Sequence, residues 1–528
     1  MNDYFSSTQT IRKAVVPTRA GIVAAQHRRA AEVGAAVLEA GGDAVDAAVA
    51  TSFAIGVVEP WMSGLAAGGA MVLWRAGESR PYVVDYGMRS PRELDPADYP
   101  LVGKGTARDL FAWPLVKDDR NVEGATAVAV PGVVAGMGLA HARFGRLPWR
   151  ELVEPAAALA DEGMLLDWYS GLIIASNARA LARDPDAAAM VLEDGCYAPL
   201  GTWTAATEKR LDQRRLAATL RASAAGGARA FYEGDVAQAL VNDVRAKGGS
   251  LSLADFARYA AAIGDALVVP YRGGRVLAAP GLTGGPTLAR SLETLSRMLT
   301  PTRGTPGAES YVAYARALDD AWRHRLGDDG MGDRDAPHAP SCTTHFSVVD
   351  RHGNFCSVTQ TLLSVFGARV VSPSTGLLLN NGIMWFDPVP GKANSLGPAK
   401  RCLGNFCPVI GETADGVRFA LGASGGRKIV GTVLQIASFL IDHGLDLEAA
   451  FHAPRIDMSG NETVVADQTL PDDVVAALRS TFPTLTARRT HFPAAFAVPA
   501  AVLRKDGVNT GCTEIMSPWG DAIAERSA

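Results

Sequence analysis

Long apolar runs, runs of like charge and paired cysteines are all missing from this sequence. No stretch reaches the roughly 18 consecutive apolar residues that a membrane-spanning helix needs, and residues 1–20 lack the apolar segment of a secretory signal. The 51 basic and 55 acidic residues are mixed along the chain, so no strongly charged patch for nucleic acid or a membrane surface is predicted. We therefore expect a cytoplasmic protein that binds a small molecule and has no nucleic-acid or membrane partner.

Cysteines are few and scattered. None of the six forms a Cys-x-x-Cys pair, and none belongs to a cysteine and histidine set with the spacing of a metal site. Cys402 and Cys407 are close in sequence, but a cytosolic protein keeps such thiols reduced. We expect no metal, no cofactor and free thiols.

Alanine-rich amphipathic segments dominate the first part of the chain, which is 528 residues long and 48% hydrophobic. Apolar residues recur at three- and four-residue spacing and predict helices over 26–40, 44–58, 133–144, 148–162, 235–247, 253–259 and 308–326. Strands are predicted over 70–75, 81–86 and 274–280. Residues 328–341 are polar, contain Gly and Pro and lack periodicity, so we expect a flexible loop that leads into Cys342.

The pattern changes to strands after Cys342. Residues 343–350 and 355–362 are predicted strands, and the turn-like residues 351–354 between them predict a β-hairpin. A four-residue loop pairs Thr343 with Leu362, whereas a loop one residue shorter or longer pairs Thr343 with Thr361. The two threonines are neighbours in either register and share a face only in the second.

A threonine that begins a strand after a loop suits one particular chemistry. A threonine hydroxyl is a weak nucleophile and needs a base, which can be its own α-amine once the preceding peptide bond is cut. Such an amine has a pKa of about 8, near the range needed for proton transfer at neutral pH. Position and spacing alone are compatible with this role for Thr343 without requiring it.

Several blocks of sequence add to this hypothesis. They are GGDAVDAAVATSFAIGVVEP (41–60), VPGVVAGMGLAHARFGRLPW (130–149), ARAFYEGDVAQALV (228–241), TTHFSVVDRHGN (from 343), TGLLLNN (375–381) and GASGGRKIVGTVLQ (422–435). In this order, they resemble the γ-glutamyltransferase family of N-terminal nucleophile hydrolases. The resemblance implies an α+β fold, a four-layer αββα sandwich.

The resemblance also implies a precursor that cuts itself between Cys342 and Thr343. Residues 1–342 would form a large subunit and residues 343–528 a small subunit, both kept in one αββα domain, with a dimer of this unit left open. Thr343 would be the nucleophile, and Thr361 would hydrogen-bond to it and assist processing, which favours the register that pairs the two. Gly425 and Gly426 match the glycine pair whose N–H groups hold the oxyanion.

The sequence departs from the family where the γ-glutamyl group is bound. The arginine with which the family binds the γ-glutamyl group corresponds to Gly87 in this sequence. Arg89 is a candidate replacement, although residues i and i+2 of a strand lie about 7 Å apart. The acidic residue after the paired asparagines, which end at Asn381, falls on Trp385. The family's Ser-Ser pair falls on Gly404 and Asn405, and a polar position falls on Leu363.

These departures predict an altered acyl pocket with the chemical groups retained. We expect water to release the acyl group, and an acyl donor outside the standard γ-glutamyl compounds; oxamate-like and glutaryl- or cephalosporin-like amides are both open. The substrate-binding candidates are Arg89, Asn381, Trp385, Gly404 and Asn405. Trp385 is equally compatible with packing in a lid.

Other functions remain as alternatives. One is a true γ-glutamyltransferase or glutathione hydrolase, and another is an unprocessed, non-catalytic relative that binds a ligand or partner. Gly422-Ala423-Ser424-Gly425-Gly426 also satisfies the G-x-S-x-G pattern of a serine hydrolase, but the helix-rich first half lacks the repeated βα units of such a fold. His345 shares a strand face with Thr343, and we expect a structural role for it because the freed amine can serve as the base.

Overall fold

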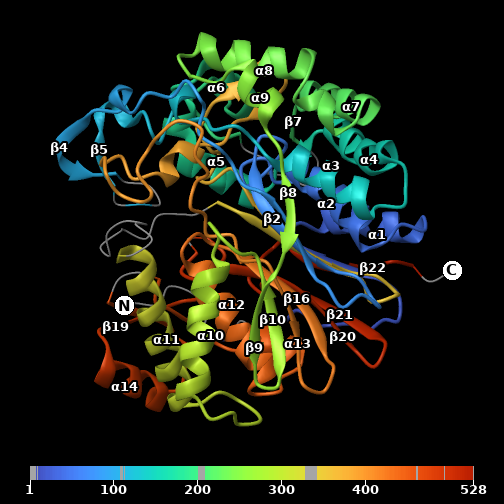
Figure 1. Ribbon diagram of the computed structural model, residues 1–528, viewed down its shortest axis with the longest axis vertical. Coiled ribbons are helices and arrows are strands. Elements are labelled where there is room, and N and C mark those ends of the chain that lie inside the picture. The colour runs from blue at the N-terminus through green and yellow to red at the C-terminus, as the bar shows by residue number, and fades with distance from the viewer. Residues whose placement is uncertain are drawn as a thin grey trace.

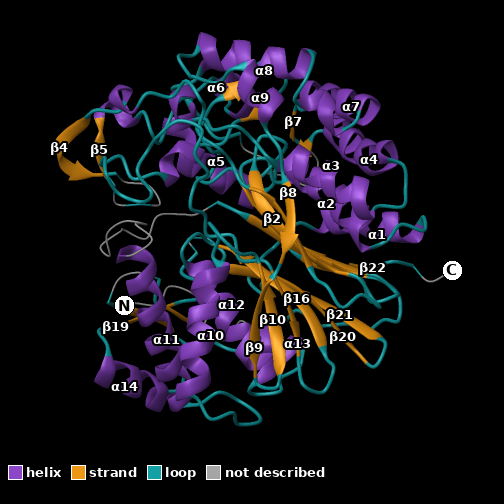
Figure 2. Ribbon diagram, viewed as in Figure 1, coloured by secondary structure: helices purple, strands orange, loops and turns teal. Residues whose placement is uncertain are grey.

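The computed structural model describes residue 8 and residues 10–107, 111, 113–199, 208–327, 342–459, 462–492 and 494–526. The expected loop over 328–341 lies outside these described residues. The fold is α+β: two large antiparallel sheets lie at the centre and helices surround them (Figure 2). Among the described residues, no helix has both the length and the apolarity required to span a bilayer.

The first sheet has seven strands and the second has six, and every neighbouring pair in them is antiparallel. In sheet order, the first contains β22 (Asp521–Ala524), β1 (Ile22–Ala25), β11 (Thr344–Val349), β12 (Phe355–Thr361), β2 (Gly68–Trp74), β3 (Tyr82–Tyr86) and β8 (Ala262–Asp265). The second contains β21 (Val508–Thr513), β20 (Val498–Lys505), β16 (Arg418–Ser424), β15 (Val409–Glu412), β10 (Gly274–Ala278) and β9 (Leu267–Tyr271).

Both sheets combine strands from the two sides of the Cys342–Thr343 bond. In the first sheet β11 lies between β1 and β12, and β12 pairs with β2. In the second sheet β10 pairs with β15. Strands β11 and β12 also pack against β16, so the two sheets contact each other face to face. Neither sheet is complete without residues from both sides of the bond.

Helices cover the outer face of each sheet (Figure 1). Helices α1 (Arg28–Glu39), α2 (Ala44–Val58) and α3 (Val133–Phe144) contact the seven-stranded sheet, and α4 (Trp149–Glu162), α5 (Trp168–Leu181), α6 (Pro185–Val191), α7 (Arg214–Gly226), α8 (Asp235–Ala246) and α9 (Leu253–Arg258) lie on the same side of the molecule. Helices α10 (Gly285–Met298) and α12 (Lys428–Ile441) contact the six-stranded sheet, with α11 (Ala308–Gly327), α13 (Leu447–His452) and α14 (Asp472–Thr481) beside them.

Shorter strands lie outside the two main sheets. They pair as β4 (Leu101–Thr106) with β5 (Pro114–Val116), β6 (Met164–Leu165) with β7 (Arg210–Leu211), and β13 (Val371–Ser372) with β14 (Leu377–Leu378). A three-stranded sheet contains β17 (Ile456–Asp457), β18 (Val464–Asp467) and β19 (Thr484–Ala487).

The hydrophobic core has two parts that lie on opposite faces of the seven-stranded sheet. Strand β1 illustrates this division, because alternate side chains of a strand point to opposite faces. Val23 and Ala25 join the cluster shared with α1 to α4, whereas Ile22 and Ala24 join the cluster shared with the six-stranded sheet and α10 to α12. Strand β1 is therefore buried on both faces.

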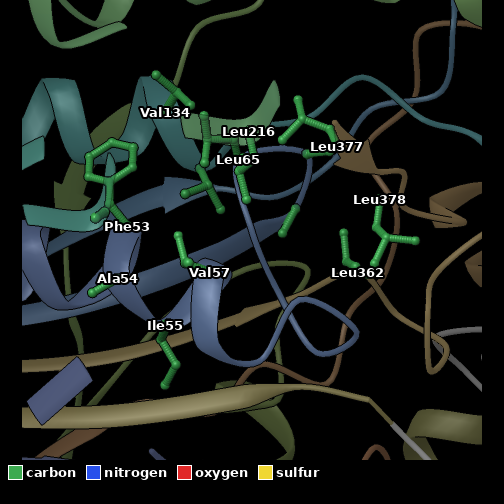
Figure 3. Packing of buried hydrophobic residues seen from close by; sticks show 14 of the residues in the cluster. Phe53, Ala54, Ile55, Val57, Leu65, Val134, Leu216, Leu362, Leu377 and Leu378 are labelled. Carbon is green, nitrogen blue, oxygen red and sulfur yellow. The ribbon is translucent and has the colours of Figure 1, made fainter. Parts of the chain in front are cut away.

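Helix α2 is buried along its whole length, and it packs against β11 and β12. A capping box at Asp43 starts the helix, and the helix packs on α1, α4, β11 and β12. Figure 3 shows Phe53 and Val57 from this helix in the cluster that also includes Leu362, next to Thr361. The packing of α2 thus connects the core directly to the end of β12.

The observed hairpin has the longer of the loops that the sequence left open. Val349 pairs with Phe355 and Thr344 pairs with Gln360. This register excludes the four-residue loop and places Thr343 opposite Thr361, as the second register predicts.

Candidate active site

Thr343 directly precedes β11 and is buried, with 5% of its surface exposed. Its hydroxyl lies within hydrogen-bonding distance of the carbonyl oxygen of Cys342 and is 3.3 Å from the hydroxyl oxygen of Thr361. Thr361 donates to the same carbonyl oxygen at 2.5 Å. The carbonyl of the bond between Cys342 and Thr343 is therefore contacted by both hydroxyls.

The backbone around this carbonyl is held from two directions. The N–H of Cys342 donates to the carbonyl oxygen of Leu363 at 3.3 Å, and its thiol donates to the carbonyl oxygen of Trp61 at 2.6 Å. Leu363 has a φ of +91°, which is uncommon for a residue with a side chain. Its N–H donates to the hydroxyl of Thr361 at 2.8 Å, so the strained residue helps to orient that hydroxyl.

A buried carboxyl group contacts Thr344, the residue that follows Thr343. Glu59 follows α2, and Thr344 donates to its carboxyl oxygen at 3.2 Å. Burial raises the pKa of Glu59 to about 8. A neutral carboxyl group is therefore favoured at neutral pH beside the strand that begins with Thr344.

Gly425 and Gly426 lie where β16 ends and α12 is about to begin. Their φ values are +142° and +57°, which residues with side chains rarely adopt. A Cβ atom on Gly425 would also come within 2.7 Å of the Cβ of Ala497. Gly426 lines the same pocket as Thr343. The tight turn thus needs glycine for its backbone conformation and for space.

A small pocket opens beside Thr343. Its apolar lining consists of Phe111, Cys342, Leu363, Trp385, Phe406 and Ile429, and its polar lining consists of Thr343, Thr361, Asn405, Gly426 and Arg427. Trp385 and Phe406 meet edge to face with ring centroids 5.1 Å apart. Of the described lining residues, Arg427 is the one that carries a charge.

Arg427 is a pocket residue that the sequence reasoning missed. It follows the glycine pair directly, is 9% exposed, and its guanidinium lies 5.4 Å from the ring centroid of Phe111. Its place after Gly425-Gly426 was a usable sequence signal. Phe111 gave no such signal, because it lies in a loop far from the other lining residues in sequence.

Trp385 and Asn405 line the pocket and Gly404 directly precedes Asn405 outside the lining, while their role in substrate binding stays a prediction. Arg325 of α11 is almost fully buried and donates to the carbonyl oxygen of Gly404 at 2.5 Å and to the side-chain oxygen of Asn405 at 3.3 Å. It also donates to the carbonyl oxygen of Thr283 at 2.8 Å. Arg325, which the sequence reasoning also missed, fastens this loop to α11.

Asn381 does not line the pocket, and its side chain holds neighbouring loops together. Its amide nitrogen donates to the carbonyl oxygen of Val122 at 2.9 Å and to the hydroxyl of Ser364 at 2.8 Å, and its amide oxygen accepts from the N–H of Ser364 at 3.0 Å. The side chain is fully buried. These bonds join three loops, so the amide is occupied without a substrate.

Arg89 is exposed and also lies outside the pocket lining. Its backbone bridges to Val130 and Arg401. The space beside Gly87 is filled by Arg401, because a Cβ atom there would lie 2.8 Å from a guanidinium nitrogen of Arg401. Arg401 is paired with Asp85. Arg89 therefore does not reach the pocket beside Thr343. Gly87 has no side chain that could take the place of an arginine there.

His345 lies between the two sheets, outside the pocket lining. One ring nitrogen is 2.9 Å from the hydroxyl of Thr359 and the other is 3.0 Å from that of Ser347. Burial lowers the pKa of His345 to about 3. A Cβ atom on Gly422 would overlap the ring. A neutral imidazole with two hydroxyl partners fits the structural role that the sequence predicted.

The serine-hydrolase alternative does not fit the fold. Ser424 ends β16, whose neighbours β15 and β20 are both antiparallel to it, whereas that alternative needs a parallel strand. The Ser424 hydroxyl accepts from the side chain of Gln26 at 2.8 Å. Within the part of the chain that the structure describes, no group of three or more His, Cys, Asp and Glu side chains is arranged for a metal.

Comparisons with known proteins agree on one family. The family model described as Gamma-glutamyltranspeptidase matches residues 30–342 and 328–505. The acylase ACY 1 proenzyme of Pseudomonas sp. (strain V22) is 34% identical over 493 residues, which cover 87% of this chain and 86% of that protein. The glutathione hydrolase proenzyme of Bacillus subtilis (strain 168) is 29% identical over 509 residues, covering 87% of this chain and 84% of that one.

A solved structure shares the fold over the full chain. The cephalosporin acylase from Bacillus halodurans superposes with a TM-score of 0.82 and covers 100% of both chains, at 23% sequence identity. At this identity the likeness concerns the fold alone.

Proposed function

The chain belongs to the gamma-glutamyltranspeptidase family, and we propose that it is a self-cleaving amide hydrolase whose nucleophile is the hydroxyl of Thr343. The observation that carries this proposal is the contact of two hydroxyls, those of Thr343 and Thr361, with the carbonyl oxygen of Cys342. A threonine poised on the peptide bond that precedes it is the arrangement that intramolecular cleavage requires. The amidohydrolase class itself follows from the family.

Cleavage begins when the hydroxyl oxygen of Thr343 attacks the carbonyl carbon of Cys342. The hydroxyl of Thr361 stabilises the oxyanion that forms. The bond to the nitrogen of Thr343 then breaks, this nitrogen takes the proton, and an ester joins Cys342 to the Thr343 oxygen. Water hydrolyses the ester, which leaves a carboxylate on Cys342 and a free amine and hydroxyl on Thr343.

Turnover uses the same groups a second time. The free α-amine of Thr343 accepts the hydroxyl proton as the oxygen attacks the substrate amide, and passes it to the leaving amine. The N–H groups of Gly425 and Gly426, next to the N-terminus of α12, hold the oxyanion. Water then releases the acyl group. The support is the location of Gly426 and Thr343 in one pocket.

The cleaved product is proposed to remain one unit. Residues 1–342 and 343–528 would be a large and a small subunit of one αββα sandwich of the N-terminal nucleophile type. This proposal is supported by the mixing of strands in both sheets, since β11 pairs with β1 and β15 pairs with β10. Separation of the subunits would expose both cores.

The acyl donor is proposed to be a small-molecule amide other than a standard γ-glutamyl compound, with oxamate-like and glutaryl- or cephalosporin-like amides as candidates. Trp385 and Leu363 line the pocket where the family places polar groups, and Arg401 fills the space beside Gly87. The higher identity to a protein named as an acylase, 34% against 29% for the glutathione hydrolase, points the same way.

A true γ-glutamyltransferase or glutathione hydrolase is the second candidate. The name of the Bacillus subtilis relative favours it. Release of p-nitroaniline from γ-glutamyl-p-nitroanilide, stimulated by an added amino acid acceptor, would support this candidate over the first.

The test of the main proposal starts with purified protein on a denaturing gel. We expect two bands that together account for the full chain, with Thr343 as the first residue of the smaller one by N-terminal sequencing. The T343A variant should give one band. A wild-type band that stays whole on long incubation would mean that the chain is an unprocessed relative. Hydrolysis of glutaryl, oxamate-like and γ-glutamyl amides by the cleaved protein then separates the candidate substrates.

A further inference from the structure

We propose that Arg427 binds a carboxylate at the far end of the acyl group, so that the substrate is a monoamide of a short dicarboxylic acid. This inference rests on the proposed function, because it concerns the acyl group that Thr343 would carry. It assigns the recognition of that group to a residue outside the positions where the sequence predicted binding.

The charge distribution in the pocket is the first reason. Arg427 lies in the same pocket as Thr343 and is 9% exposed. Among the described residues that line the pocket, it is the one with a charged side chain. An arginine guanidinium presents a planar set of N–H donors that matches a carboxylate in two parallel hydrogen bonds. A pocket of this kind favours an acyl group with a negative end.

The position of Arg427 next to the glycine pair is the second reason. Gly426 is the preceding residue, and its N–H is proposed to face the oxyanion of the reacting carbonyl. Arg427 therefore extends from the backbone at the point where one end of the acyl group would be held. The ring of Phe111, 5.4 Å from the guanidinium, limits where the side chain can go.

The rest of the lining fits a short hydrocarbon chain between two polar ends. Leu363, Ile429 and Phe406 present apolar surface to the pocket. Trp385 adds a polar atom, because its indole N–H is buried and makes no hydrogen bond within the described residues. A substrate oxygen that accepts this N–H would satisfy it. The pocket offers donors and apolar surface, and its described lining has no acid for the α-amine of a glutamyl group.

The experiment compares two p-nitroanilides of the same length, glutaryl and valeryl, which differ in the terminal carboxylate. For the wild type we expect kcat/KM to be higher for the glutaryl compound. In R427Q the ratio of the two kcat/KM values should fall about 100-fold or more, mainly through KM for the glutaryl compound. R427K should recover part of the ratio, because it keeps the charge and loses the fork of donors.

A matched control removes a neighbouring positive charge. Lys428 is the next residue, lies outside the pocket lining, and donates to the carbonyl oxygen of Ala494 at 2.6 Å. K428Q should keep the ratio of the wild type, which separates a local contact from a general loss of charge. W385F should lower the ratio by a smaller factor than R427Q.

The outcomes distinguish this inference from the proposed function. A gel of every variant shows whether the chain has been cleaved, and R427K serves if R427Q does not fold or process. If the wild type is cleaved and hydrolyses amides but R427Q keeps the wild-type ratio, Arg427 does not bind the acyl carboxylate and the inference is overturned alone. A wild type that is neither cleaved nor active on any amide would overturn the proposed function first.

Discussion

The two sides of Thr343 are built in different ways. On one side, the carbonyl of Cys342 and the hydroxyl of Thr361 are positioned by strand register and backbone hydrogen bonds, including that from the N–H of Leu363. On the other side, the acyl pocket is made of side chains from separate segments, such as Phe111, Trp385 and Arg427. Groups determined by the backbone tolerate few changes, whereas a pocket of side chains can change its ligand through substitutions.

This difference would account for the pattern that the sequence resemblance predicts. Thr343, Thr361 and the glycine pair, which the resemblance predicts to match the family, are positioned by the backbone. Trp385 and Asn405, which the resemblance predicts to depart from the family, line the acyl pocket. If this comparison holds, the groups around the carbonyl of Cys342, here called the nucleophile side, should be rigid and should tolerate few substitutions.

Removal of the proposed nucleophile has the largest expected effect. T343A should abolish both chain cleavage and amide hydrolysis, with activity lower by about 10⁴-fold or more. The reason is that the variant loses the hydroxyl that is proposed to attack first the carbonyl of Cys342 and then the substrate. A denaturing gel and a p-nitroanilide assay measure the two effects. T343S, which keeps a hydroxyl, should retain part of both; full activity in T343A would transfer the chemistry to another residue.

Loss of the Thr361 hydroxyl should have the next largest effect. T361A removes the donor at 2.5 Å from the carbonyl oxygen of Cys342, and losing one oxyanion donor slows a reaction by about 10²–10³-fold. The rate of band conversion on a gel after rapid purification measures the cleavage step. T361S restores the donor and is the matched control. Equal cleavage rates in the wild type and T361A would show that Thr361 only packs beside the bond.

The buried carboxyl group of Glu59, which contacts Thr344, should make stability depend on pH. The pKa of Glu59 is about 8 in the folded chain, above its ordinary value of 4.5. The folded state therefore keeps a proton that the unfolded state loses, so the contribution of Glu59 to stability falls as the pH rises from about 4.5 to 8.

E59Q should remove this pH dependence and keep a neutral partner for Thr344. Relative to the parent, its free energy of unfolding should rise with pH across this range, by a few kcal/mol at most. Urea unfolding at pH 5 and pH 9 measures it, with both proteins in the T343A background so that each is a single chain. A constant difference between the two proteins at both pH values would contradict the raised pKa.

Much of the nucleophile side could be predicted from the sequence. Helix α2 was predicted with its observed bounds, and the hairpin was predicted with its register narrowed to two choices. Local periodicity and turn chemistry determine these features, so a sequence pattern can report them. The pairing of Thr343 with Thr361 follows from the register once the loop length is known.

The pocket side was harder to predict because its residues meet only through tertiary packing. Asn381 was assigned to substrate binding, but its amide is used by Val122 and Ser364. Arg325 reaches the Gly404-Asn405 loop from α11, a contact that no local pattern indicates. A polar residue in a family block can equally serve the substrate or the scaffold, and only the hydrogen-bond partners distinguish the two.

The glycine turn provides the prediction with the smallest effect. Gly425 has a φ of +142° and faces Ala497, whereas Gly416 has a φ of +83° in an exposed turn with no atom within 4 Å of an added Cβ. G416A should therefore cost about 1 kcal/mol from backbone strain alone. G425A should cost roughly 2 kcal/mol more, because a φ of +142° is less accessible to a residue with a side chain and because the methyl group also meets Ala497 at 2.7 Å.

Urea unfolding of both variants in the T343A background measures these costs. If both substitutions lower the free energy of unfolding by the same amount, the backbone near Ala497 moves to accommodate the methyl group. The turn is then more flexible than a rigid nucleophile side would be. A larger cost for G425A means that the turn of the proposed oxyanion donors needs glycine, both for its φ of +142° and for its closeness to Ala497. In that case the geometry of the turn is independent of whichever acyl group the pocket holds.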